Sequence, residues 1–257
     1  MIHDIVTWLT DPAHWQGSEG VPTRVGEHVV YSLAAVVVAA LVALPLGLVI
    51  GHTGRGTVAV AGVANAVRAL PTLGLLTLFV LLLLPHVTSD WVYLGPGEAV
   101  LFLLAVPPIL TNTYAGVQNV PPDVRDAAEG MGMTGTGVLL RVELPCALPL
   151  ILSGVRAAVL QCIATATVLA VVTLGGLGRF IIDGQHQRDF PKMASGALIV
   201  ALLALLADGL LVLLSRAVVS PGVTGRAGRS RPGHARALSR ARGRFHPAHS
   251  LSPQELS

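Results

Sequence analysis

The charged and small side chains with the most distinctive spacing lie in one polar segment, residues 118–146, between two apolar runs. Asp123 can cap a helix that begins at the next residue, because an aspartate accepts hydrogen bonds from unpaired amides at a helix start. Ala127 and Ala128 leave room for the close approach of another protein, and Gly132 permits a bend that a side chain would resist. The pattern predicts a compact docking segment and not a reactive centre.

The second half of this segment predicts another short helix. It should run from about Thr136 to Leu144 and stop before Pro145, because a residue that precedes proline is disfavoured in the helical conformation. Two short helices separated by a glycine break would then form a knob outside the hydrocarbon.

Side chains that could perform catalysis are sparse. A phosphate-binding loop needs a lysine that reaches the phosphates, whereas the glycine-rich turn at residues 51–57 has Thr57 in that place. The single lysine, Lys192, has no glycine-rich surroundings. Cys146 and Cys162 have no partners at metal-ligand spacing, so we expect them to be small packing residues. We therefore expect no catalytic residue, metal or cofactor, and any ATP would be bound by another polypeptide.

Composition places the surrounding elements in lipid. Of the 257 residues, 53% are hydrophobic and 12% are charged, whereas soluble domains carry roughly a quarter charged residues. Several apolar runs are long enough to cross about 30 Å of hydrocarbon as helices. We predict an all-α integral membrane protein with five transmembrane helices, at residues 28–50, 58–84, 98–117, 147–174 and 195–219.

The second of these runs is interrupted around Pro71. Because proline removes an intrahelical hydrogen bond, residues 58–84 form either one kinked helix or two half-helices. One kinked span is the preferred interpretation, since a sixth span would place one terminus on the wrong side of the membrane.

The distribution of arginine predicts the orientation. Residues 216–244 contain eight arginines and no acidic residue, so the C-terminus should be cytoplasmic. Five spans then place residues 1–27, which lack the basic start of a signal peptide, outside a bacterial plasma membrane. Residues 28–219 would form the transmembrane domain, and residues 220–257 a disordered cytoplasmic tail. For this arginine-rich tail, attraction to anionic lipid is preferred over nucleic-acid binding, because its sequence has neither a fold nor interleaved aromatic residues.

Polar side chains inside the predicted spans mark a candidate solute pathway. Thr111, Asn112 and Tyr114 lie together in the third span, although such residues often hydrogen-bond neighbouring helices instead. Aromatic residues make up 4% of the chain and are too scattered to predict a cage for a cationic solute. Selection of a solute would therefore depend on a separate protein.

Asp208 is the isolated carboxylate of the last span. A charge in this position is costly unless it is paired or close to water, and Arg156 or Arg68 could pair with it. Asp208 would be either one half of a structural ion pair or part of a gate in the pathway.

The spacing in the polar segment resembles the EAA loop found in permease subunits of binding-protein-dependent ABC importers. That motif reads Glu-Ala-Ala, three residues, Gly, nine residues and Ile-X-Leu-Pro. This chain keeps the register and departs from it twice, with aspartate for glutamate and valine for isoleucine. The matching residues are Asp126, Ala127, Ala128, Gly132, Val142, Leu144 and Pro145.

Four further stretches look like the osmoprotectant branch of these permeases, which imports glycine betaine, carnitine, choline, proline or related compounds. They read RALPTLGLL, PPILTNTYAGV, ELPCALPLILSGVRAA and TLGGLGRFI. The resemblance implies the type I ABC importer permease fold over residues 28–215.

The resemblance also implies partners. The loop at residues 118–146 would couple to a cytoplasmic ABC ATPase, and a second permease, either a copy or a paralogue, would complete a dimer in the lipid. Arg179 and Asp183, in a loop that the predicted topology places outside, would dock an extracytoplasmic substrate-binding protein. The alternative is a self-contained secondary transporter or channel, which would need internal inverted repeats and would leave the EAA spacing unexplained.

Overall fold

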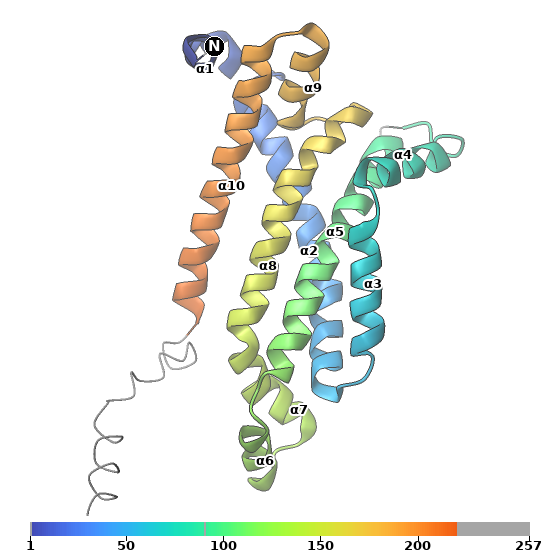
Figure 1. The fold of residues 1–257 in the computed structure, drawn as a ribbon, viewed down its shortest axis with the longest axis vertical. Coiled ribbons are helices and arrows are strands. Elements are labelled where there is room, and N and C mark those ends of the chain that lie inside the picture. The colour runs from blue at the N-terminus through green and yellow to red at the C-terminus, as the bar shows by residue number, and fades with distance from the viewer. Residues whose placement is uncertain (1, 90, 220–257) are drawn as a thin grey trace, which may run out of the picture. The chain divides into compact units, whose positions relative to one another are not determined.

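A computed structural model of the chain describes residues 2–89 and 91–219. The predicted tail at residues 220–257 lies outside the described residues. The described part is helical (Figure 1), and short 3₁₀ turns at Pro12–Trp15 and Thr167–Val172 accompany the helices. The α-helices are α1 (Ile2–Thr10), α2 (Val21–Thr53), α3 (Thr57–Ala69), α4 (Thr72–Leu83), α5 (Trp91–Gln118), α6 (Pro122–Gly130), α7 (Gly135–Val138), α8 (Leu144–Ala166), α9 (Gly178–Gln187) and α10 (Phe190–Val218).

The core of the bundle is formed by α2, α5 and α8, which pack side by side (Figure 1). Its fully buried side chains include Ala39, Ala43, Ala105 and Ala158, one or two from each of these helices. A Cβ atom at Gly47 would lie 2.7 Å from the Cβ atom of Thr113. Small residues of this kind let helix backbones approach closely in lipid, where packing has to replace the hydrophobic effect between helices.

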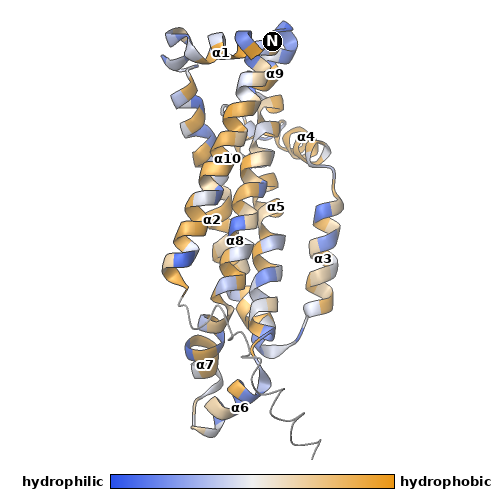
Figure 2. Ribbon diagram, turned by 60° about the vertical axis from the view of Figure 1, so that its left-hand side comes forward, coloured by the Kyte–Doolittle hydropathy of each residue, from blue (hydrophilic) through white to orange (hydrophobic). Residues whose placement is uncertain are grey.

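The predicted all-α membrane fold is confirmed. Within residues 2–89 and 91–219, four helical segments are long and apolar enough to cross a bilayer. They are α2, α5, α10 and the continuous helix Gly135–Val172, which contains α7 and α8. Figure 2 shows that apolar residues dominate along these helices. The predicted count of five holds when α3 and α4 are taken together as one span.

The geometry of α3 and α4 differs from a kinked helix, because the two are bent by 87°. Leu70 has the extended conformation, with φ −73° and ψ 132°, which is the region that a residue before proline prefers. Helix α3 therefore ends at Ala69, before Pro71, and α4 starts again in a new direction. The two half-helices that the sequence also allowed describe this region better than one kinked helix.

The first membrane helix starts earlier than the apolar run indicated. Helix α2 begins at Val21, so seven residues of the predicted N-terminal segment belong to this helix. Within those residues, Arg24 pairs with Glu19 and Glu27, and the Glu27 carboxylate accepts a hydrogen bond of 2.7 Å from the Gly176 amide. Charged side chains can be part of the helix here because they form ion pairs with one another and because one of them accepts a hydrogen bond from the backbone of the loop before α9.

Candidate functional site

Helix α6 opens the polar segment at the lower end of the bundle in Figure 1. It starts at Pro122, two residues earlier than expected, and no side chain caps it. The predicted cap by Asp123 is therefore wrong. Asp123 lies in the first turn, where a negative charge is still favourable beside the positive end of the helix dipole.

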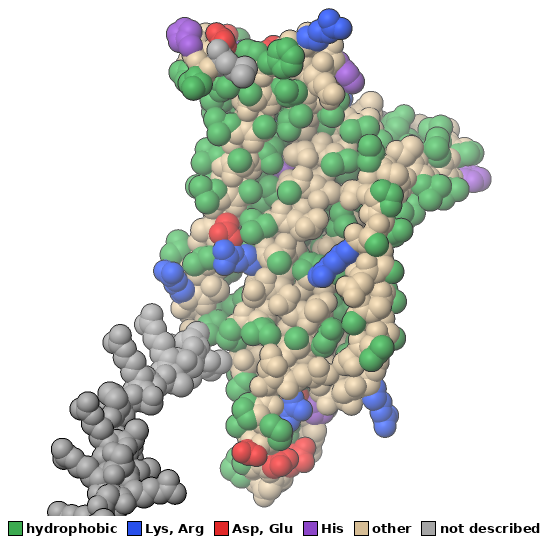
Figure 3. Space-filling model, viewed as in Figure 1, with side chains coloured by type: hydrophobic (Ala, Val, Ile, Leu, Met, Phe, Trp, Pro, Cys, Tyr) green, Lys and Arg blue, Asp and Glu red, His purple; other side chains and the backbone are tan. Residues whose placement is uncertain are grey.

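The motif residues of α6 divide between its two faces. Asp126 and Ala127 are exposed, whereas Ala128 is 2% exposed and rests on the protein. Acidic side chains gather over α6 in Figure 3, and the exposed apolar residues Val124 and Met131 lie on the same helix and its end. This exposed face suits a partner groove that offers positive charge and apolar contact.

Gly132 ends α6 in a way that only glycine adopts easily. Its φ is +84°, in the left-handed region where a Cβ is strained. The amide of Met133 bonds to the Ala128 carbonyl at 3.2 Å, and the Gly132 amide bonds to the Glu129 carbonyl at 2.8 Å. These bonds close the helix end. The sequence predicted this glycine break.

The second helix of the segment does not stop before Pro145, which corrects the expectation from the sequence. Helix α7 starts at Gly135, with Thr134 as its cap, and continues through a π-helical turn, Leu139–Glu143, directly into α8. The wide turn lies just ahead of Pro145, which has no amide hydrogen to donate. Val142, Leu144 and Pro145 are thus half-buried helical residues that anchor the segment to α8.

A buried carboxylate joins this segment to the membrane helices, and sequence reasoning did not single it out. Glu143 is 1% exposed. Its Oε2 lies 2.7 Å from Nδ1 of His52, and its Oε1 lies 2.9 Å from Nε of Arg125. The one signal in the sequence was a carboxylate between two apolar motif residues, Val142 and Leu144, because its partners are distant along the chain.

The predicted pathway residues lie at a contact between helices. Asn112 donates to the Pro108 carbonyl at 2.8 Å within α5, and its Cβ would lie 2.7 Å from a Cβ atom at Gly154 of α8. Thr111 and Tyr114 are half-buried on the same helix. This arrangement supports the helix-packing interpretation for Asn112.

Asp208 pairs with Arg156 and not with Arg68. The carboxylate receives two hydrogen bonds, 2.5 Å from Nε and 2.8 Å from Nη2 of Arg156. The two side chains are 25% and 44% exposed. The pair links α10 to α8, and its bidentate geometry is typical of strong arginine–carboxylate contacts.

Arg179 and Asp183 lie on α9, at the opposite end of the bundle from α6 (Figure 1). They form an ion pair of 3.0 Å with each other, and both are half-buried. The more exposed polar residues of this element are Gln185, His186 and Gln187.

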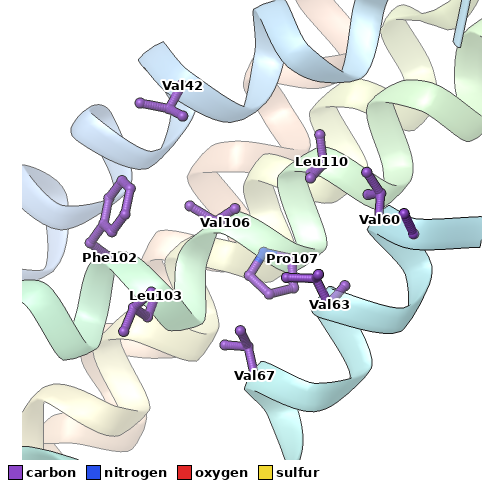
Figure 4. Close-up of a pocket in the computed structure, with 11 residues that line it drawn as sticks. Val42, Val60, Val63, Val67, Phe102, Leu103, Val106, Pro107 and Leu110 are labelled. Carbon is purple, nitrogen blue, oxygen red and sulfur yellow. The ribbon is translucent and has the colours of Figure 1, made fainter. Parts of the chain in front are cut away.

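A hollow of about 290 Å³ lies between α2, α3 and α5 (Figure 4), and the residues that line it are apolar. Val63, Phe102 and Pro107 point into it. Such a surface suits a lipid chain or another apolar helix, not a polar solute. Among residues 2–89 and 91–219, no group of three or more His, Cys, Asp and Glu side chains is placed to hold a metal ion.

Relatives of the chain are permease proteins. It is 36% identical over 202 residues to the glycine betaine/carnitine/choline transport system permease protein OpuCB of Bacillus subtilis, covering 79% of this chain and 90% of that protein. It is 32% identical over 198 residues to the osmoprotectant import permease protein OsmW of Salmonella typhimurium, covering 77% and 91%. A carnitine transport permease protein of Listeria monocytogenes, OpuCD, is 36% identical over 185 residues, covering 72% and 80%.

The fold is shared with a chain of the MetNI methionine ABC transporter in an inward-facing conformation. The TM-score is 0.68 at 20% identity, over 82% of this chain and all of that one. The predicted type I importer permease fold is thereby confirmed. A family model described as the inner membrane component of binding-protein-dependent transport systems matches residues 43–220. The chain therefore belongs to the family of inner membrane components of binding-protein-dependent transport systems, and it is a multi-pass permease subunit and not itself an enzyme.

Proposed function

We propose that the chain forms the membrane path of an ATP-driven importer and that α6 seats in a groove of a separate ATPase, which binds the ATP. The observation that carries this proposal is the division of the motif between faces. Asp126 and Ala127 are exposed, Ala128 is buried, and Gly132 has a left-handed backbone that closes the helix. The last three motif residues lie in the helical turn that leads into α8 and at the start of α8 itself, and they would give α6 a rigid base; they are Val142, Leu144 and Pro145.

The α6 end of the bundle faces the cytoplasm in this proposal. Arginine-rich sequence after residue 216 supports a cytoplasmic C-terminus, and α9 lies at the other end of the described bundle (Figure 1). The outer end would receive a substrate-binding protein. Because Arg179 and Asp183 are paired with each other, Gln185–Gln187 offer the more accessible groups for that contact.

The exposed face of α8 supports a second permease as a partner. Its exposed residues are small or polar, and include Ser153, Ala157, Gln161 and Ala164. Helix α10 instead exposes seven leucines alongside smaller residues, and Leu205 among them is 67% exposed. Leucine suits lipid, whereas small and polar residues in a span suit contact with another helix or a polar pathway. A dimer would therefore be formed with α8 facing the partner and α10 facing lipid.

This difference predicts the effect of a bulky residue on each helix. Ala157→Trp should reduce uptake at least about tenfold, since overpacking of a close helix contact commonly costs 1–3 kcal/mol. Leu205→Trp is the matched control and should retain uptake. Size-exclusion chromatography of the detergent-solubilised complex would measure whether the dimer forms. Uptake in vesicles would measure transport by each variant. Equal behaviour of the two variants would contradict the assignment of these faces.

We propose quaternary ammonium osmoprotectants as the substrate class, on the basis of the names of the relatives. Because aromatic residues make up only 4% of the chain, the binding protein would provide most of the selectivity. The test is uptake of labelled glycine betaine, carnitine and choline into proteoliposomes that contain the complete complex and internal ATP, with methionine as the control solute. ATP-dependent uptake of methionine alone would refute this substrate class.

A further inference from the structure

The buried carboxylate of Glu143 lies where four helical elements meet. It belongs to the π-helical turn that leads into α8, and it is 1% exposed although the segment around it is polar. A buried carboxylate is stable only when donors surround it. Its two partners here, a histidine and an arginine, come from two other elements.

His52 provides the first contact, from the last turn of α2. Its Nδ1 lies 2.7 Å from Oε2 of Glu143, and a carboxylate can only accept, so this nitrogen carries the hydrogen. The other ring nitrogen, Nε2, would lie 3.5 Å from a Cβ atom at Gly135, the first residue of α7. The imidazole therefore bonds to Glu143 at the end of the helical stretch 135–143 and lies close to Gly135 at its start.

Arg125 provides the second contact, from the middle of α6. Its Nε lies 2.9 Å from Oε1 of Glu143, and its Nη2 donates to the Val117 carbonyl at 2.5 Å. Val117 is in the last turn of α5, where carbonyl groups lack partners within the helix. One guanidinium group thus connects α6 to α5 and to the base of α8.

We propose that Glu143 is a positioning residue for coupling: it transmits displacement of α6 to α2, α5 and α8. This inference rests on the proposed function, in which α6 seats on the ATPase. Ala128 is the buried residue of α6, and an alanine contact alone allows a helix to slide. His52 forms a hydrogen bond with Glu143, and the Arg125 guanidinium forms an ion pair with the same carboxylate, so these contacts oppose displacement of α6 relative to the membrane helices. When the ATPase moves α6, these contacts carry the movement to the ends of the helices.

The test uses Glu143→Gln, which keeps the size of the side chain and removes its charge. The control is Arg55→Gln, which removes a charge from an exposed residue of the turn after α2, outside the loop at residues 118–146. Each is assembled as the complete complex in proteoliposomes, and solute uptake, ATP hydrolysis and the recovery of ATPase are measured. We expect Glu143→Gln to recover the ATPase normally while uptake per ATP hydrolysed falls at least about tenfold, within the usual range of coupling between sites. Arg55→Gln should match the wild type.

A merely structural role would lower uptake and ATP hydrolysis together, in proportion to the complex recovered, and that result would overturn the proposal. Unchanged uptake per ATP in Glu143→Gln would also overturn it. Failure of the proposed function looks different, because the wild-type chain itself would then recover no ATPase.

If the Glu143→Gln chain does not accumulate in the membrane, a pair of variants at His52 tests the same proposal. His52→Gln keeps a donor for the carboxylate, whereas His52→Leu removes it. We expect the glutamine variant to retain coupling and the leucine variant to lose it. Equal uptake per ATP in the two variants would refute the proposal.

Discussion

Replacing Gly132 by tryptophan will release the ATPase from the complex and reduce uptake at least about tenfold. The left-handed backbone at this residue, with φ +84°, costs an L-residue about 1–2 kcal/mol, and tenfold corresponds to 1.4 kcal/mol. The indole would also project from the exposed end of α6, where the partner groove must approach. The measurements are uptake and the amount of ATPase that copurifies with the tagged chain.

Gly130→Ala is the matched control for this prediction. Gly130 lies two residues earlier, has a helical backbone, and has open space where a Cβ atom would be placed. Alanine should therefore be tolerated there. Normal ATPase recovery and normal uptake in Gly132→Trp would show that this turn does not contact the ATPase.

Replacing Asp208 by leucine will lower the amount of folded chain in the membrane several-fold, because it leaves the charge of Arg156 unpaired within the span. The two side chains share hydrogen bonds of 2.5 and 2.8 Å. Removing both charges, with Arg156→Leu and Asp208→Leu together, should restore the amount of folded chain. Replacing a complete ion pair by apolar residues is often neutral.

Uptake by the double variant separates the two interpretations of Asp208. Because the carboxylate is fully engaged by Arg156, we expect uptake to return together with the folded chain. A double variant that accumulates normally but does not transport would contradict the structural interpretation and would assign the pair to the gate. Immunoblotting of membranes and uptake in vesicles provide the two measurements.

Hydropathy predicted most of the helices, because each run is about as long as the hydrocarbon is thick. It failed where a local rule competes with hydropathy. Charged residues such as Arg24 did not look like membrane helix, yet Glu19 and Glu27 compensate that charge and α2 begins at Val21. Hydropathy also could not predict the 87° bend at Pro71, since a proline allows a wide range of angles between the two halves.

The candidate site was predicted where the information is local. Asp126, Ala127 and Gly132 lie within seven residues, and their spacing alone indicated an exposed helix that ends in a glycine turn. The contacts of Glu143 could not be predicted in this way. His52 is 91 residues away in sequence, and only the folded bundle brings the end of α2 to the base of α8. Pro145 misled for the same reason, because the π-helical turn that accommodates it depends on the packing of that base.

The central claim is that α6 and its turn contact an ATPase on the cytoplasmic side. A photo-crosslinking amino acid placed at Met131, which is 73% exposed beside Gly132, tests it most directly, with the same probe at Gln187 on α9 as the control. In membranes from cells that express the complete complex, we expect the probe at Met131 to capture a P-loop ATPase and the probe at Gln187 to capture none. An intact chain that captures no ATPase from Met131, or captures it from Gln187, would contradict the account.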